Sequence, residues 1–304
     1  MTEILSLVAT FLPLFVIIGV ANLAEARREK DEPYQGLALV AYVFLVAIYA
    51  AAILCGLLLH VISFAAATDP SILTGQLAIF GEADSLALTA FGLWIPSLVG
   101  ILLLLPVVRR IVARIIHIDP ADPIHAVALS MTVLAVVNMA STLGIGLGTV
   151  ADRLEEAGGL GGNPLLTLWT QQILFALLGT IGVGWLTRRN WRTTLERLGL
   201  TALTGRQLLI GIGVGLGIVV IVILIQIAAG MLGLASDADV DRLTEMMFGP
   251  IFMTPFGILT IGLSAALGEE ILLRGAMLPR FGVILTTLFF VILHVQYGVS
   301  IALL

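Results

Sequence analysis

Residues 261–278 read IGLSAALGEEILLRGAML, an apolar run that is interrupted by Glu269, Glu270 and Arg274. An apolar run of this length is typical of a helix that spans a lipid bilayer. A charged side chain at bilayer depth costs about 2.5 to 3.5 kcal/mol on insertion scales, so such residues usually face the interior of a helix bundle and mark function. We therefore expect this segment to lie in a membrane bundle and to carry the functional site.

The composition of the whole chain agrees with this expectation. Its 304 residues are 59% hydrophobic and 12% charged, a balance that excludes a water-soluble globule. Apolar runs long enough to span a membrane occupy residues 4–23, 37–67, 86–108, 124–148, 165–186, 207–234, 251–278 and 282–304. The predicted fold class is all-α, a polytopic transmembrane bundle of about eight spans, with the lipid bilayer as its surroundings.

If the connections between successive spans are numbered in chain order, positive charge is concentrated in the odd-numbered ones. All but two of the 15 Lys and Arg residues lie in the odd-numbered connections, and only Arg153 and Arg242 lie in the even-numbered ones. The positive-inside rule then predicts an external N-terminus and cytoplasmic odd-numbered connections. We expect an integral protein of a bacterial cytoplasmic membrane whose site is approached from the cytoplasm. No basic patch points to nucleic acid, and the single Cys55 excludes an internal disulfide framework.

The charged residues of the opening segment have a spacing that suits chemistry. Glu270 and Arg274 are four residues apart, so on a helix they can pair, while Glu269 points about 100° away from Glu270. Two adjacent carboxylates in an apolar setting perturb each other's protonation, as a general base or a metal ligand requires. The alternative is an interfacial charge cluster with no chemistry.

His294 is the next candidate, because helix geometry brings it to the glutamates. About ten residues, or about 15 Å of helix, separate Glu269 from the turn at residues 279–282, and about 18 Å separates that turn from His294. In an antiparallel hairpin the two residues therefore reach similar depth. A lone buried histidine is usually a packing residue, whereas one level with an acidic pair favours a ligand or a hydrogen-bonding catalytic group.

The order of these residues resembles the CPBP family of intramembrane proteases, the CAAX protease and bacteriocin-processing group. The matching motifs are EExxxR at Glu269, Glu270 and Arg274, and FxxxH at Phe290 and His294. The resemblance implies an endopeptidase that acts on prenylated (CAAX-type) or other membrane-associated peptides. It implies Glu269 as general base, Glu270 as a second carboxylate or metal ligand, Arg274 as an orienting cation, and His294 as a ligand or oxyanion-stabilising group.

The motifs leave the cofactor open. Zinc or another divalent metal, held by Glu270 and His294, and a metal-free glutamate mechanism both fit them. The family pattern continues with a further helix that bears a second histidine, which this sequence does not contain before Leu304. On the resemblance, residues 1–206 are N-terminal transmembrane helices of about five spans, and residues 207–304 are a catalytic core that is incomplete at its C-terminus.

Two other functions are compatible with the same residues. A polytopic transporter could use a buried Glu/His pair as a proton relay. A non-catalytic membrane scaffold or immunity-type protein could keep the fold without the chemistry. The absence of an evident inverted repeat disfavours the transporter.

The remaining polar residues and glycines of the spans are expected to have structural roles. Interhelical hydrogen bonds are expected at His60, Asn138, Gln171, Gln172 and Gln226. His117 and His125, at a loop boundary, are expected to be solvated. A close approach of another helix is expected at Gly211, Gly213, Gly215 and Gly217.

Overall fold

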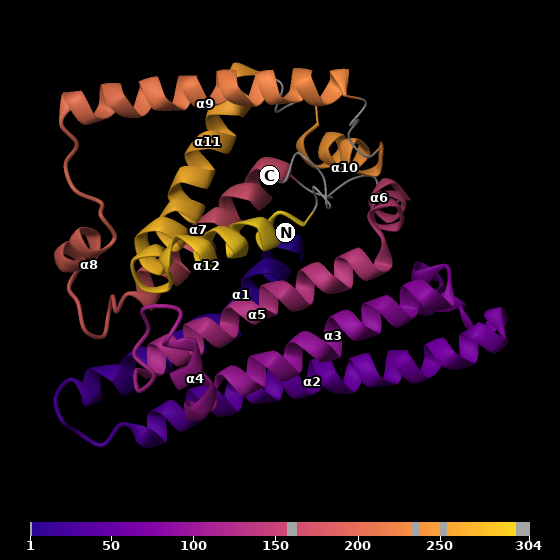
Figure 1. Cartoon of the computed structure of the whole chain (residues 1–304), viewed down its shortest axis with the longest axis horizontal. Coiled ribbons are helices and arrows are strands. Elements are labelled where there is room, and N and C mark those ends of the chain that lie inside the picture. The colour runs from indigo at the N-terminus through magenta and orange to yellow at the C-terminus, as the bar shows by residue number, and fades with distance from the viewer. Residues whose placement is uncertain (1, 157–162, 233–237, 250–253, 296–304) are drawn as a thin grey trace.

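The computed structural model of the chain describes residues 2–156, 163–232, 238–249 and 254–295, and these are helical with no β-strand (Figure 1). The α-helices are α1 (Thr2–Arg28), α2 (Gln35–Thr68), α3 (Ala83–Leu103), α4 (Pro106–Val112), α5 (Pro123–Ile145), α6 (Leu147–Glu156), α7 (Pro164–Gly182), α8 (Trp191–Arg197), α9 (Gly205–Met231), α10 (Ala238–Phe248), α11 (Pro255–Glu269) and α12 (Leu278–Leu293). Two short 3₁₀ helices, η1 (Pro70–Ile72) and η2 (Gly75–Phe80), follow α2, and a π-helix, η4 (Glu270–Met277), joins α11 to α12.

Seven of the described helical segments are long and apolar enough to cross a membrane. The last of them, Pro255–Leu293, contains both the seventh and the eighth predicted spans. The chain leaves helical geometry within it at Gly282, whose φ of 74° is in the region that favours glycine. The all-α membrane bundle is thus confirmed, and about eight crossings agree with it. The predicted span ends at residues 251–253 and 296–304 lie outside the described residues.

Helices α2, α3 and α5 form one layer of the bundle (Figure 1). Tyr49 of α2 is fully buried in this layer, and its hydroxyl donates to the carbonyl oxygen of Ser130 on α5. The Ser130 hydroxyl in turn donates to the carbonyl oxygen of Gly100 on α3, at 2.9 Å. Interhelical hydrogen bonds of this kind hold helices together where lipid offers no partner for a polar group.

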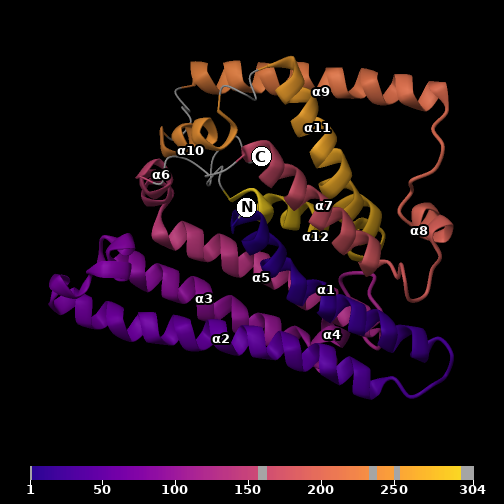
Figure 2. The same ribbon diagram turned by 180° about the vertical axis from the view of Figure 1, so that it is seen from behind.

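A second group of helices carries the candidate site. Helix α7 packs against α1, α11 and η4, and α12 packs against η4 and α5 (Figure 2). Buried Leu272, Leu273, Met277 and Phe281 from η4 and α12 share one apolar cluster with Leu129 of α5. The hairpin α11–η4–α12 is therefore anchored on both layers of the bundle.

The connections sort to two ends of the molecule. The turn from α1 to α2, α4, α8 and the start of α12 lie on the left in Figure 1, and α6 and α10 lie on the right. The left end carries the odd-numbered, basic connections, so the predicted alternation of loops is confirmed. The long apolar helices indicate an integral membrane protein.

Helix α9 stands apart from the other described helices. None of its residues is buried, and no described atom outside its own backbone lies within 4 Å of a Cβ built at any of its four central glycines. The predicted close approach at Gly211, Gly213, Gly215 and Gly217 is therefore wrong for the described part of the chain. Gln226 is also exposed on α9, and it makes no interhelical hydrogen bond with the residues that the structure describes. A helix that is apolar all round can be covered by lipid instead of protein.

Candidate functional site

The candidate site lies where α11 passes into η4 beside α7. Gly268 permits this contact, because a Cβ at this position would overlap Oε1 of Gln172 and would lie 2.6 Å from the carbonyl oxygen of the same residue. Two turns further along α7, a Cβ at Gly179 would lie 3.0 Å from the Cα of Leu272 in η4. The backbones of α7 and the α11–η4 segment are thus in direct contact on both sides of Glu269.

We expect Gly268→Ala to destabilise the protein by about 1 to 3 kcal/mol, because the added methyl group overpacks the α7–α11 contact. Gly262→Ala is the matched control on the same helix, since a Cβ at Gly262 meets nothing within 4 Å. The control should be neutral or slightly stabilising, because alanine is the better helix former. Thermal unfolding in detergent, followed by circular dichroism, measures both. Equal midpoint temperatures of unfolding for the two variants would contradict the close contact at Gly268.

Glu269 meets two side chains from different helices. Its Oε1 accepts a hydrogen bond from Nε2 of Gln172 at 2.9 Å. Its Oε2 lies 3.9 Å from Nε2 of His294. The side chains of Glu269 and His294 are each 19% exposed, so the pair is largely shielded. The predicted meeting of these two residues across the hairpin is confirmed, while their chemical roles stay a prediction.

The end of α12 fixes the orientation of His294. Its Nδ1 lies 2.8 Å from the carbonyl oxygen of Phe290, one of the terminal carbonyls that a helix end leaves without an intrahelical partner. Because a carbonyl only accepts, Nδ1 carries the proton in this contact, and in the neutral ring Nε2 is then the acceptor atom that faces Glu269. The rings of Phe290 and His294 lie 4.3 Å apart between centroids. The four-residue spacing of FxxxH therefore packs the aromatic ring on the imidazole.

Glu270 and Arg274 form the predicted pair on the other side of the segment. Arg274 Nε lies 3.0 Å from Glu270 Oε2, and the two side chains are 74% and 46% exposed, respectively. The i,i+4 pairing is confirmed. The expectation that both carboxylates are buried holds for Glu269 and is wrong for Glu270, because α7 covers only the Glu269 side of the segment.

The backbone of this segment is a π-helix, whereas the sequence suggested an α-helix. η4 begins at Glu270, immediately after Glu269. Such insertions are rare and often occur at functional sites. Arg197 of α8 donates from Nη1 to the carbonyl oxygen of Gly275 at 3.1 Å, and a Cβ at Gly275 would lie 3.0 Å from Leu198 Cδ2. Helix α8 therefore packs directly on the widened turn.

The donor set of the site is smaller than a closed metal site requires. His294 lies beside Glu269, while Glu270 pairs with Arg274. Within the described ranges, no group of three or more His, Cys, Asp and Glu side chains converges as metal ligands would. A protein site for zinc usually supplies three or four such ligands. The described residues thus do not fit a complete metal site, and Glu269 and His294 are the pair of groups that this part of the chain brings together.

Gln172 is the site residue that the sequence did not single out. Its predicted interhelical hydrogen bond is confirmed, with Glu269 as the acceptor. An amide inside an apolar run indicated that Gln172 needs a hydrogen-bond partner. The sequence could not identify that partner, because Glu269 is almost a hundred residues away along the chain. His60, by contrast, packs edge-on against the rings of Phe64 and Phe91, and its buried Nδ1 has no hydrogen-bond partner among the described residues. The interhelical hydrogen bond predicted for His60 is therefore wrong for the described part of the chain.

His125 also differs from its prediction. His117 is exposed as expected, but His125 is buried in the first turn of α5, against Asp119 of the α4–α5 connection. Its Nδ1 accepts from the backbone N–H of Asp119 at 2.9 Å, and its Nε2 lies 3.5 Å from Asp122 Oδ2. The expectation of a solvated His125 is therefore wrong.

Comparison of the chain with models of protein families, with curated proteins and with solved structures finds no match.

Proposed function

We propose that this chain is an intramembrane endopeptidase of the CPBP type that hydrolyses peptide bonds of prenylated or other membrane-associated substrates. The observation that carries the proposal is the contact between Glu269 and His294, in which each side chain is oriented by a separate partner. Gln172 holds one carboxylate oxygen of Glu269, and the Phe290 carbonyl orients the imidazole. An acid and a histidine held in this way inside an apolar bundle suit general acid–base chemistry.

The geometry supports a specific role for each of the two residues. A separation of 3.9 Å between Glu269 Oε2 and His294 Nε2 allows one water molecule to donate a hydrogen bond to both atoms. The lone pairs of that water oxygen then point away from the pair, toward a substrate carbonyl carbon. We propose Glu269 as the base that takes the water proton and His294 as the group that orients the water.

The reaction is balanced with these two groups. The water oxygen bonds to the carbonyl carbon as its proton passes to Glu269, which gives a tetrahedral intermediate. Collapse of that intermediate breaks the C–N bond, and Glu269 returns the proton to the leaving amine. The products are a carboxylic acid and an amine, and Glu269 ends as the carboxylate with which it began.

The second carboxylate has a supporting role in the proposal. Arg274 compensates the charge of Glu270 at 3.0 Å, so Glu269 is the carboxylate left to act as base. The exposed side of this ion pair is where a membrane-associated peptide would approach. We also propose that the end of the bundle with the basic connections faces the cytoplasm, which the charge distribution supports.

We expect Gln172→Leu to lower the cleavage rate about tenfold to a hundredfold. A hydrogen bond to a charged group is worth about 1.5 to 3 kcal/mol, and each 1.4 kcal/mol is about tenfold. Gln171→Leu is the control, because the neighbouring amide has no hydrogen bond to Glu269 in the structure. Initial rates on a membrane-tethered peptide in liposomes measure both variants. A Gln172→Leu rate as high as that of Gln171→Leu would exclude Gln172 as a positioning residue.

The substrate class is tested with matched peptides. Purified protein in liposomes is given a tethered peptide with a C-terminal prenyl-cysteine motif, or the same peptide anchored by an acyl chain instead. Cleavage of both identifies a general membrane-associated substrate, and cleavage of the first alone identifies a prenyl-specific enzyme. Cleavage of neither, by protein that binds both, would overturn the endopeptidase proposal.

A further inference from the structure

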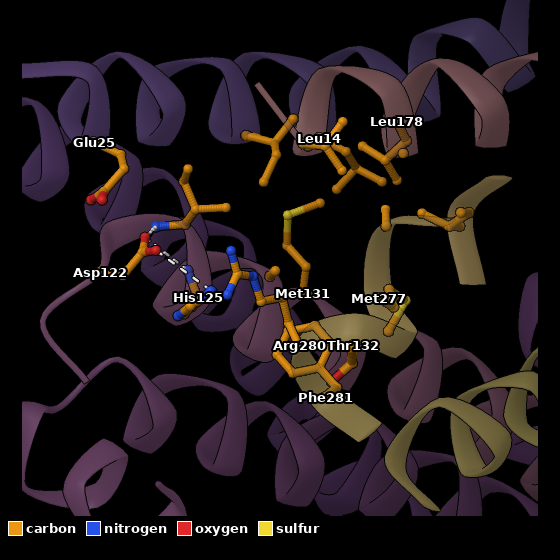
Figure 3. A pocket seen from close by; sticks show the side chains of 18 of the residues that line it. Leu14, Glu25, Asp122, His125, Met131, Thr132, Leu178, Met277, Arg280 and Phe281 are labelled. Atoms are coloured by element: carbon orange, nitrogen blue, oxygen red, sulfur yellow. Dashed lines mark hydrogen bonds and ion pairs between the residues drawn. The ribbon is translucent and has the colours of Figure 1, made fainter. Parts of the chain in front are cut away.

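A separate cavity of about 450 Å³ lies between α1, α5, α7 and the η4–α12 segment (Figure 3). Glu269 and His294 are not among its lining residues. It therefore lies beside the candidate site and is distinct from it. Its volume is within the range of about 300 to 1,000 Å³ that is typical of ligand pockets.

The inner part of this cavity is an apolar chamber. Its lining includes Leu14, Ile18, Met131, Leu178, Met277 and Phe281, which come from α1, α5, α7, η4 and α12. Figure 3 shows Leu14, Leu178 and Met131 on the side away from Glu25 and Asp122. The chamber thus offers hydrocarbon contacts within the transmembrane part of the bundle.

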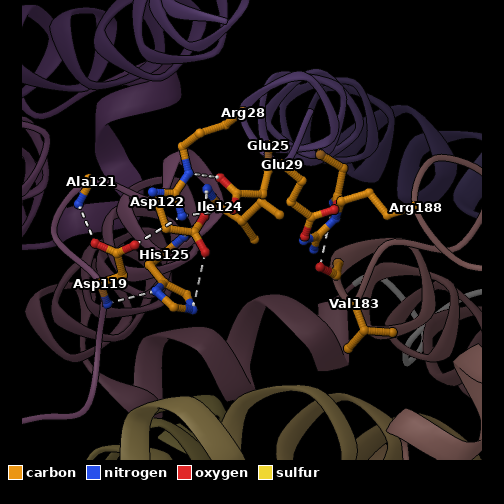
Figure 4. Close-up of polar contacts among 12 residues, drawn as sticks. Glu25, Arg28, Glu29, Asp119, Ala121, Asp122, Ile124, His125, Val183 and Arg188 are labelled. Atoms are coloured by element: carbon orange, nitrogen blue, oxygen red, sulfur yellow. Dashed lines mark hydrogen bonds and ion pairs between the residues drawn. The ribbon is translucent and has the colours of Figure 1, made fainter. Parts of the chain in front are cut away.

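The outer part of the cavity is charged, and three of its carboxylates pair with arginines (Figure 4). Arg28 lies 2.7 Å from Glu25 and 2.9 Å from Asp119. Arg188 lies 2.8 Å from Glu29 and also contacts Asn22. Glu25 and Asp119 thus share one cation, Arg28, while Glu29 pairs with Arg188.

Asp122 is the remaining acid in this charged outer part, the mouth of the cavity. It also has hydrogen-bond partners. Its Oδ1 accepts from the backbone N–H of Ile124 at 2.7 Å and of His125 at 3.3 Å, which caps the start of α5. Its Oδ2 lies 3.5 Å from His125 Nε2. Both carboxylate oxygens of Asp122 thus make contacts within the first turn of α5.

Three arginines at the same mouth have no carboxylate partner among the described residues. Arg189 and Arg197 donate to the carbonyl oxygens of Val183 and Gly275, and Arg280 extends toward His125 (Figure 3). Burial, and then repulsion from Arg280 and the other nearby arginines, lowers the pKa of Arg197. A guanidinium is a permanent cation in proteins. The cavity is thus lined by five arginines (Arg28, Arg188, Arg189, Arg197 and Arg280) and four carboxylates (Glu25, Glu29, Asp119 and Asp122), which leaves one excess positive charge next to the apolar chamber.

We infer that this cavity binds one lipid with an anionic phosphate headgroup, with one hydrocarbon chain in the chamber and the phosphate at Arg189, Arg197 and Arg280. Guanidiniums bind phosphate oxygens through paired N–H donors, and they are weakly hydrated enough to do so in a half-buried site. Basic pockets between transmembrane helices are suited to anionic lipid headgroups, which the surrounding bilayer supplies. The inference is independent of the proposed proteolysis.

The test is native mass spectrometry of the delipidated full chain in detergent, titrated with defined lipids. The arms are phosphatidylglycerol, phosphatidylcholine with the same chains, diacylglycerol, and glycerol phosphate without chains. We expect one tight equivalent of phosphatidylglycerol and at least about tenfold weaker binding in the other arms, because each lacks either the net negative charge or the chain. Equal binding of phosphatidylglycerol and phosphatidylcholine, or of glycerol phosphate and the intact lipid, would overturn the proposal.

Variants locate the binding. Arg280→Gln should weaken phosphatidylglycerol binding about tenfold. Arg280→Lys should weaken it less, because lysine keeps the positive charge but lacks the paired N–H donors of the guanidinium. Arg192→Gln is the control, since Arg192 is an exposed arginine of α8 that pairs with Glu196 and does not line the cavity. Ala135→Phe, which fills the chamber, should weaken the intact lipid without changing the weak binding of glycerol phosphate. Equal effects of Arg280→Gln and Arg192→Gln, in variants that unfold at the wild-type temperature, would place the lipid elsewhere.

Discussion

Glu269→Gln is expected to lower the rate of peptide cleavage by about 10²- to 10⁴-fold, the usual contribution of a general base. The amide keeps the shape of the side chain but cannot accept the water proton. Gln172 can still contact it, because the amide oxygen accepts from Gln172 Nε2 as Oε1 of Glu269 does at 2.9 Å. The loss should therefore appear in kcat, with little change in KM. Initial rates over a range of tethered-peptide concentrations in liposomes measure both constants.

Two further variants make this result specific to Glu269. Glu156→Gln removes an exposed carboxylate that pairs only with Arg153 in the described structure, and it should cleave at the wild-type rate. Glu270→Gln removes the carboxylate that Arg274 compensates, and it should retain more activity than Glu269→Gln. Full cleavage by a well-folded Glu269→Gln variant would eliminate Glu269 as the base. Proton flux through liposomes that Glu269→Gln abolishes, with no cleavage by the wild type, would favour the transporter.

The fold class was accessible from the sequence because lipid imposes a simple rule. Backbone groups in hydrocarbon must be satisfied within the segment, so long apolar runs become helices. The turn at Gly282 followed from the Pro279–Gly282 signal for the same local reason. The π-helix at Glu270 was not accessible, because its contacts come from distant residues: Gly179 of α7 adjoins Leu272, and Arg197 of α8 donates to the Gly275 carbonyl.

The candidate site also has some features that could be predicted from the sequence and others that could not. The Glu270–Arg274 pair and the FxxxH stacking depend on four-residue spacing along one helix, so they could be predicted. The meeting of Glu269 and His294 followed from equal distances to one turn. Gln172 could be predicted only as a residue that needs a partner, because its identification requires the packing of α7 on α11 at Gly268.

The error at His125 has a physical cause as well. A histidine at a loop boundary is usually solvated, but the α4–α5 connection folds back so that Asp119 and Asp122 both bind its ring. Arg28 of α1 also pairs with the Asp119 carboxylate of this connection, at 2.9 Å. Local sequence contains the capping residue Asp122 but not the cation from another helix.

His294→Ala is expected to lower the cleavage rate by about 10²-fold, comparable to the effect of misplacing a reacting group by about 1 Å. The variant keeps Glu269 as base but removes the acceptor atom 3.9 Å from it that would orient the water. Because the imidazole is held by the Phe290 carbonyl at 2.8 Å and by ring contact with Phe290, its removal leaves a small space at the end of α12. Added imidazole should occupy that space and restore part of the rate, which a purely structural role for His294 would not predict.

His60→Ala is the matched control, since His60 is also a histidine within a span, and its ring contacts are with Phe64 and Phe91. It should cleave at the wild-type rate, and added imidazole should not change that rate. If His294→Ala instead lost its thermal stability together with its activity, Phe290→Leu would separate the two effects. That variant removes the stacked ring but keeps the backbone carbonyl that orients Nδ1, so it should lower stability more than cleavage. A His294→Ala enzyme that is stable and fully active would refute the water-orienting role and leave Glu269 to act without the imidazole.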